Sequence, residues 1–152
     1  MNRTAELAQG FKARLPSGTE WLTYAQCGDK RIYPWGNEWP PKYGNYSGLE
    51  SAYPQKIGVC RDDYPVTCGV EQSGKNDGGL YGVGGNVWEW TDEVSGATRL
   101  LRGASWCTPC GDAYLRNDGG ISRQPSLRDF NVGFRVMILP EKPGKDGAVS
   151  SG

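Results

Sequence analysis

Histidine is absent from the 152-residue sequence. Without imidazole, the chain cannot use Ser-His-Asp or Cys-His catalysis, imidazole-ligated zinc, histidine-ligated haem or the usual pH switch near neutrality. A charge excess is also lacking, because 17 Lys and Arg residues balance 17 Asp and Glu residues. A protein that binds nucleic acid through bulk electrostatics needs a basic excess. We therefore expect no nucleic-acid partner.

Long apolar segments are missing as well. No run of 18 apolar residues occurs, and the N-terminal residues lack the apolar core of a signal peptide. The sequence therefore predicts a soluble chain with no membrane insertion and no export address. Its localisation stays open at this point.

The length corresponds to one ordinary domain. With 23 Gly, 10 Pro, 6 Trp and 8 Tyr, the composition is typical of a loop-rich fold held by aromatic rings, and it excludes a helical bundle. We predict a single α+β domain over residues 1–139, with a small antiparallel sheet, one or two short helices and a large loop fraction. Residues 140–152 carry no apolar anchor and are expected to form a flexible tail.

Only a few segments carry regular patterns. Ser17 to Glu20 form a capping box, which predicts a helix that ends at Cys27–Gly28. A second short helix is expected over residues 5–9. Apolar alternation predicts strands over 86–91 and 131–138, with a further short strand at 99–103. Residues 31–85 show no period and are predicted to be ordered loops pinned by aromatic side chains.

Five cysteines are an odd number, so at least one thiol is free or pairs outside the chain. Cys60 and Cys68 flank a turn that a disulfide could close. Cys107 and Cys110 form a C-x-x-C pair, but a zinc site would need distant partners, and no helical period follows as in thioredoxin-like motifs. The simplest interpretation is thiols without chemistry.

Six segments, in order, resemble motifs of the formylglycine-generating-enzyme (sulfatase-modifying factor) family. They are Arg14–Trp21, Tyr33–Pro40, Gly44–Gly48, Gly79–Trp90, Leu101–Trp106 and Gly133–Val136. The resemblance implies a C-type-lectin-like fold of the formylglycine-generating-enzyme subtype. Because one fold serves several functions, the resemblance leaves the function open.

The first function that the resemblance implies is a copper and thiol oxidase that converts a cysteine of a protein substrate to formylglycine. The family's two reactive cysteines correspond to Thr108 and Asp112 here, so both thiols are displaced. Cys107 and Cys110 are the catalytic candidates of this alternative, and a Cu(I) site would need their sulfur atoms to converge. Related sulfoxide-forming enzymes use histidine-ligated iron, which the absence of histidine excludes.

The second function is that of a variable protein of a diversity-generating retroelement, which is a non-enzymatic display domain. Arg116, Pro125, Arg128 and Val132 match its C-terminal pattern in spacing, whereas Leu115, Asp118 and Gly120 depart from it. We favour this interpretation over the oxidase and over a generic non-enzymatic relative, and it requires no cofactor. The partner would be a protein or cell-surface ligand, and the chain would be surface-displayed or virion-associated. The predicted binding surface, about residues 107–131, comprises Cys107, Thr108, Asp112, Tyr114, Asn117, Gly119, Ile121, Ser122, Arg123, Ser126, Leu127, Asp129, Phe130 and Asn131.

Two further expectations concern calcium and the first strand. The resemblance assigns a calcium ion to the carbonyls of Gly85 and Val87 and to the Glu89 carboxylate, but Gly82 lacks the side-chain oxygen expected there, which weakens the site. The alternative is that Glu89 holds loop backbone. Only 13 residues precede Arg14, which favours a compact binder. Either these residues or a partner chain supply the first strand.

Overall fold

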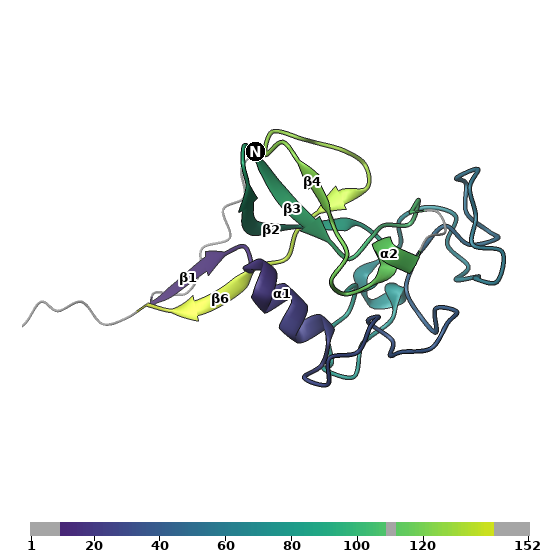
Figure 1. The fold of residues 1–152 in the computed structure, drawn as a ribbon, viewed down its shortest axis with the longest axis horizontal. Coiled ribbons are helices and arrows are strands. Elements are labelled where there is room, and N and C mark those ends of the chain that lie inside the picture. The colour runs from purple at the N-terminus through teal and green to yellow at the C-terminus, as the bar shows by residue number, and fades with distance from the viewer. Residues whose placement is uncertain (1–9, 109–111, 142–152) are drawn as a thin grey trace, which may run out of the picture.

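The computed structural model describes residues 10–108 and 112–141, with the side chain of Asp112 not described. Two small sheets and two short helices are joined by long loops, which confirms the predicted α+β class (Figure 1). The elements in chain order are β1 (Phe11–Arg14), α1 (Gly18–Ala25), a 3-10 turn η1 (Val70–Ser73), β2 (Trp88–Ser95), β3 (Thr98–Arg102), α2 (Asp112–Leu115), β4 (Ile121–Arg123), β5 (Val132–Gly133) and β6 (Met137–Pro140).

Helix α1 begins where the capping box predicts. The Ser17 hydroxyl accepts a hydrogen bond from the Glu20 amide at 3.1 Å, and the Glu20 carboxylate accepts one from the Ser17 amide at 2.8 Å. The helix buries Trp21 and Ala25 on one face. It ends at Ala25, two residues earlier than expected, and Cys27 follows with a positive φ. The helix expected over residues 5–9 lies outside the described residues.

The larger sheet has the strand order β4-β3-β2-β5. β2, β3 and β4 are antiparallel neighbours, but β5 runs parallel to β2, with Val132 beside Trp88. The sheet is therefore mixed, which corrects the prediction of a small antiparallel sheet. The parallel pairing arises because the chain returns to β2 only after passing through β3, α2 and β4, and such a long excursion permits a parallel neighbour.

The predicted strand over 131–138 is two strands in different sheets. After β5, the chain leaves the larger sheet and β6 pairs antiparallel with β1 from Phe11↔Pro140 to Arg14↔Met137. Residues before Arg14 therefore supply the strand that pairs with the C-terminal strand. Figure 1 shows this two-stranded ribbon at one end of the molecule, beside α1. The pairing extends to Pro140, one residue beyond the expected domain end, and residues 142–152 of the expected tail lie outside the described part.

Aromatic rings hold the loops between α1 and β2, as predicted. Tyr33 stacks on Trp35 with ring centroids 4.6 Å apart, and Trp35 contacts the edge of buried Tyr46 at 5.7 Å. These rings join Trp88 and Leu101 in the main core. Packing of large aromatic side chains, rather than regular secondary structure, therefore holds these loops against β2.

Backbone contacts fix the loops where no ring does. Gly85 has a positive φ, and a Cβ there would lie 2.0 Å from the Asn45 carbonyl oxygen, so glycine is required at this crossing. The Asn86 amide donates to the same carbonyl at 2.7 Å. The Asn86 side-chain oxygen accepts from the Cys68 amide at 2.9 Å. The segment before β2 therefore joins two distant loops.

The cysteines that the structure describes are unbridged. Cys27, Cys60, Cys68 and Cys107 are free thiols, so the turn between Cys60 and Cys68 is not closed by a disulfide. No group of three or more Cys, Asp or Glu side chains suited to a metal ion occurs within 10–108 and 112–141. In the same ranges, no helix is long and apolar enough to span a membrane.

Candidate functional site

The C-terminal half of the domain surrounds a cavity of about 210 Å³, which we call the aromatic cavity. Its walls come from β2, α2, β4 and the segments that precede α2 and β5, together with one residue of the long loop region. Six of its residues belong to the predicted binding surface. The full lining is Tyr53, Trp88, Ser105, Cys107, Thr108, Tyr114, Ile121, Arg123 and Asn131.

Aromatic side chains form the floor and edge of this cavity. Trp88 is buried, and its ring meets that of Tyr114 edge to face at 6.4 Å. Tyr114 is 47% exposed and Tyr53 is 36% exposed, so both rings present apolar surface at the opening. Ile121 packs on the core opposite Leu101, which fixes β4 beside the cavity. The arrangement combines rigid support with exposed contact area.

The polar base of the aromatic cavity is internally hydrogen-bonded. The Asn131 side-chain amide donates to the Cys107 sulfur at 3.2 Å. The hydroxyls of Ser105 and Thr108 are 3.1 Å apart, and the Ser105 amide donates to Thr108 Oγ1 at 2.9 Å. Cys107 and Thr108 are both buried. They belong to the base of the cavity, which corrects their assignment to an exposed face.

Arg123 is the one positively charged residue in the described lining of the aromatic cavity. Its Nη1 donates to the Ser122 carbonyl at 2.9 Å. Across the β3–β4 ladder its Cα partner is Arg99, whose Nη1 donates to the Asp92 carbonyl at 3.0 Å. In the described part of the chain, neither guanidinium has a carboxylate within 4.0 Å.

Two other residues of the predicted surface line a second hollow. Leu127 and Asp129 help to line a cavity of about 370 Å³ together with Trp90, Val132 and Phe134. Phe130 is exposed, and its ring lies 5.8 Å from that of Trp106. Ser122 and Ser126 are exposed to solvent. The C-terminal segment therefore contributes to two neighbouring concave surfaces.

Two predicted contact residues belong instead to the scaffold. Asn117 is 1% exposed, its side chain donates to the Arg31 carbonyl at 2.9 Å and its amide to the Ile32 carbonyl at 2.8 Å. At Gly119, a Cβ would lie 2.1 Å from the Ala113 carbonyl oxygen. Both positions hold the turn after α2, and the Asn117 side chain is enclosed there rather than presented to a ligand. Cys110 and the Asp112 side chain lie outside what the structure describes.

Glu89 occupies the centre of a buried ion pair. Its Oε1 accepts from Arg135 Nη2 at 2.5 Å, and its Oε2 accepts from Arg135 Nε at 2.7 Å and from the Trp21 indole at 2.8 Å. The Arg135 guanidinium also lies 5.3 Å from the Tyr24 ring centroid. Arg135 lies in the segment between β5 and β6, so its ion pair joins this segment to β2, and the Trp21 hydrogen bond adds α1. Both carboxylate oxygens of Glu89 are used.

The geometry around Glu89 does not fit the calcium site that the resemblance implied. Arg135 Nη2 donates to the Tyr81 carbonyl at 3.1 Å, so a fixed cation stands between Glu89 and the backbone beside Gly82. The Gly85 carbonyl accepts from the Val87 amide at 2.9 Å. Calcium needs six to eight oxygen ligands, and here the one carboxylate of the set is already neutralised.

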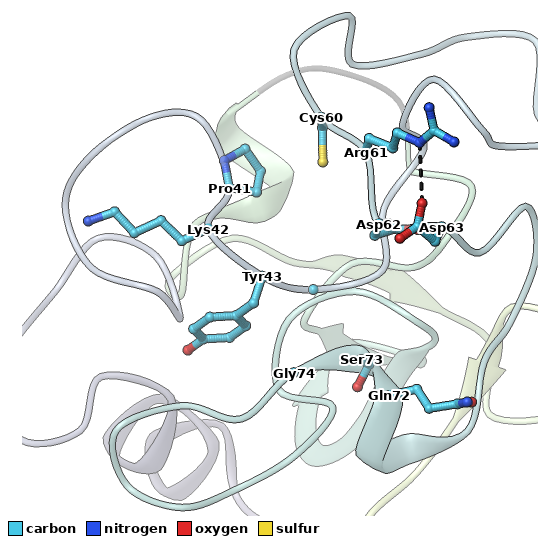
Figure 2. A pocket seen from close by; sticks show the side chains of 11 residues that line it. Pro41, Lys42, Tyr43, Cys60, Arg61, Asp62, Asp63, Gln72, Ser73 and Gly74 are labelled. Carbon is cyan, nitrogen blue, oxygen red and sulfur yellow. Dashed lines mark hydrogen bonds and ion pairs between the residues drawn. The ribbon is translucent and has the colours of Figure 1, made fainter.

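A third cavity, of about 270 Å³, lies among the loops, and sequence reasoning missed it. Figure 2 shows three segments around it, with Tyr43 on one, Cys60 to Asp63 on another and Gln72 to Gly74 on the third. The Asp62 carboxylate accepts from the Tyr46 and Tyr64 amides at 2.8 and 3.0 Å. The Asp62 carboxylate therefore fixes loop backbone.

Burial affects the protonation of Asp62 and Cys60 in this cavity. It raises the pKa of Asp62 to about 6, an effect that neighbouring Glu50 increases. Burial also raises the pKa of the Cys60 thiol to about 11, so this thiol is protonated at neutral pH. A protonated thiol is a poor nucleophile, so Cys60 is not activated for covalent chemistry.

Comparison with known proteins gives a consistent result. A sequence profile of the sulfatase-modifying factor enzyme 1-like domain matches residues 3–139. The protein named inactive C-alpha-formylglycine-generating enzyme 2 of Bos taurus is 37% identical over 142 residues, which cover 86% of this chain and 45% of the relative. The formylglycine-generating enzyme of Thermomonospora curvata is 39% identical over 152 residues, covering 84% of this chain and 50% of the relative. The chain therefore spans about half the length of these relatives.

A solved structure has the same fold. Treponema denticola variable protein 1 superimposes with a TM-score of 0.65 at 24% identity, over 84% of this chain and 48% of that chain. At this identity the likeness concerns the fold alone. Together with the profile match, it confirms the predicted C-type-lectin-like fold of the formylglycine-generating type.

Proposed function

Because the chain belongs to the sulfatase-modifying factor enzyme 1-like family, we propose that it is a ligand-binding member that uses the aromatic cavity and the exposed side chains around it as its contact surface. The observation that carries this proposal is the convergence of separate segments on one hollow. Tyr114 from α2, Arg123 from β4 and Tyr53 from the loops all line it. A shared hollow built from three elements is typical of a binding site.

The size of the cavity indicates the kind of ligand. Its volume of about 210 Å³ is below the roughly 300–1,000 Å³ typical of sites that enclose a whole small molecule. It fits one side chain or end group of a larger partner, with the exposed rings of Tyr53, Tyr114 and Phe130 contacting the surroundings. Anchoring of one group in a central pocket is typical of protein interfaces, so the proposed partner is a protein or cell-surface ligand.

The side-chain types suit a surface that changes its specificity by substitution. Tyr offers contact area at a small entropic cost, Arg offers a forked donor, and Asn and Ser offer adaptable hydrogen bonds. We therefore propose that residues of the 107–131 segment are diversified by a retroelement. The test is genomic: a near-copy of the DNA that encodes residues 105–135, differing almost only at adenines, should lie beside a reverse-transcriptase gene. Its absence would leave a conventional binder on the same fold.

An oxidase is the enzymatic alternative, because the Thermomonospora curvata relative carries that name whereas the Bos taurus relative is named inactive. The non-enzymatic proposal is supported by Thr108, a buried hydroxyl hydrogen-bonded to Ser105, where the resemblance requires a reactive thiol. Incubation with copper, a thiol reductant and a C-x-P-x-R peptide should give no aldehyde by mass spectrometry. Turnover well above that of a Cys107→Ala control would establish the oxidase instead.

A peptide selection tests the binding proposal directly. A phage-displayed library of random peptides is panned on the full chain, and enriched peptides are titrated against variants. Tyr114→Ala should weaken binding at least tenfold, since exposed aromatic anchors at the centre of interfaces dominate affinity. Tyr81→Ala is the matched control, because Tyr81 is a similarly exposed tyrosine outside the aromatic cavity. Failure to enrich any peptide, or equal losses in both variants, would refute the proposed surface.

A further inference from the structure

Two arginines face each other beside the aromatic cavity. Arg99 and Arg123 are direct Cα partners on the antiparallel strands β3 and β4. Directly opposed residues of such a pair lie on the same face of the sheet, and like charges in this position destabilise the pairing. Ile121 shares this face, two residues from Arg123, and lines the cavity together with it. The sheet therefore carries uncompensated positive charge at the cavity.

The rest of the cavity does not supply the missing negative charge. Its described lining contains aromatic rings, an isoleucine, hydroxyls, a thiol and an amide, but no Asp or Glu. The Arg123 guanidinium donates to a backbone carbonyl through Nη1 alone, which leaves the planar fork available for a bidentate acceptor. By contrast, the Arg31 guanidinium is compensated by two carboxylates, those of Asp29 and Asp77.

Building on the proposed binding function, we propose that the ligand group held at this site is a carboxylate carried next to an aromatic or aliphatic body. The carboxylate accepts hydrogen bonds from the Arg123 fork, and Arg99 adds its charge from the adjacent strand. The apolar body lies against Tyr114 and Trp88. Two sources offer this chemistry, namely the C-terminal carboxylate of a peptide and an Asp or Glu side chain beside an apolar residue.

The test uses a charged and a neutral probe of the same shape. Phenylacetate and phenylacetamide are titrated into the ¹⁵N-labelled full chain at matched ionic strength, and amide shifts of the residues around the aromatic cavity give the two dissociation constants. We expect phenylacetate to bind about three- to tenfold more tightly, in the range of a partly exposed charged hydrogen bond. Added sodium chloride should reduce this difference, because salt screens exposed charges.

Variants identify the group responsible. Arg123→Gln should remove most of the difference between phenylacetate and phenylacetamide, and the charge of Arg99 should account for what remains. Arg123→Lys should restore part of the difference. Arg61→Gln is the matched control, because Arg61 is an exposed arginine at the other, loop-lined cavity. It should leave both dissociation constants unchanged. Amide dispersion in each spectrum reports whether the variant is folded.

Two peptides then distinguish the sources of the carboxylate. Acetyl-Leu-Phe with a free C-terminus and acetyl-Asp-Phe-amide are compared with neutral acetyl-Leu-Phe-amide, and the tighter of the two acids identifies the source. Equal binding of charged and neutral probes at the cavity would overturn the carboxylate assignment while the binding proposal stands. The absence of shifts with either probe would also overturn it, and the peptide selection then decides the binding proposal independently.

Discussion

The ion pair between Glu89 and Arg135 offers the sharpest test of how this fold is held. Glu89 is 5% exposed, and Arg135 supplies two of its three hydrogen bonds. Replacing Arg135 by Met keeps an unbranched apolar stem but removes the guanidinium, which lies over the Tyr24 ring. The Glu89 carboxylate is then left buried with the Trp21 indole as its remaining described donor.

The expected cost follows from the burial of the carboxylate. Removing one partner of a buried ion pair destabilises a protein by about 3–5 kcal/mol, because the remaining charge is uncompensated. That is a large part of the roughly 5–15 kcal/mol by which such domains are stable. With about 2–4 °C of Tm per kcal/mol at this chain length, Arg135→Met should lower the Tm by about 10 °C.

Urea unfolding followed by tryptophan fluorescence measures this change in the free energy of unfolding. Arg135→Lys keeps a charge and should lose less, and the double variant Glu89→Gln with Arg135→Met should recover part of the loss because its buried group is neutral. A cost below about 1 kcal/mol for Arg135→Met would refute the assigned role. So would recovery of this variant by calcium chloride, because that would show that Glu89 serves as a calcium ligand.

Two further changes test the core and the loop cavity. Trp88→Ala should lower the free energy of unfolding by about 3–5 kcal/mol in urea, since the ring is buried. Ser126 is exposed, so Ser126→Ala should change it by less than about 0.5 kcal/mol. Similar costs for the two variants would contradict the division into scaffold and surface. The pKa of Asp62 is raised to about 6 by burial, so the folded state holds this proton more tightly than the unfolded state and stability falls as pH rises from about 4 to about 6. Glu50→Gln removes a neighbouring negative charge and should raise the Tm at pH 7 more than at pH 4.5 in calorimetric scans, and an equal change at both pH values would contradict this account.

The sequence predicted those elements whose contacts lie between residues close together in the chain. The capping box of Ser17 and Glu20 predicted the start of α1 because all of its atoms lie within one turn. The division of residues 131–138 into β5 and β6 could not be predicted in this way. It depends on Val132 meeting Trp88 and on Met137 meeting Arg14, both contacts between distant parts of the chain.

The same distinction explains the outcome for the site. The segment 107–131 was predicted as a contact surface, and Tyr114, Ile121, Arg123 and Asn131 do line the aromatic cavity. Tyr53 was missed because its place there depends on how a long loop packs, and an aromatic residue in a loop carries no signal of its own. Asn117 and Gly119, which hold the turn after α2, were predicted as contact residues because Asn and Gly are also frequent on exposed turns.

Buried residues hold the backbone of the 107–131 segment at short intervals. Leu115 and Asn117 are buried on either side of Arg116, and Ile121 packs beside Leu101, so fixed side chains occur every few residues. The exposed positions between these buried residues lie on short stretches of backbone that are anchored at both ends. Substitution at such a position alters the contact surface while the anchors keep their hydrogen bonds and packing. The fold therefore separates the buried residues that hold the segment from the exposed residues of the proposed contact surface, even though the two kinds alternate along the sequence.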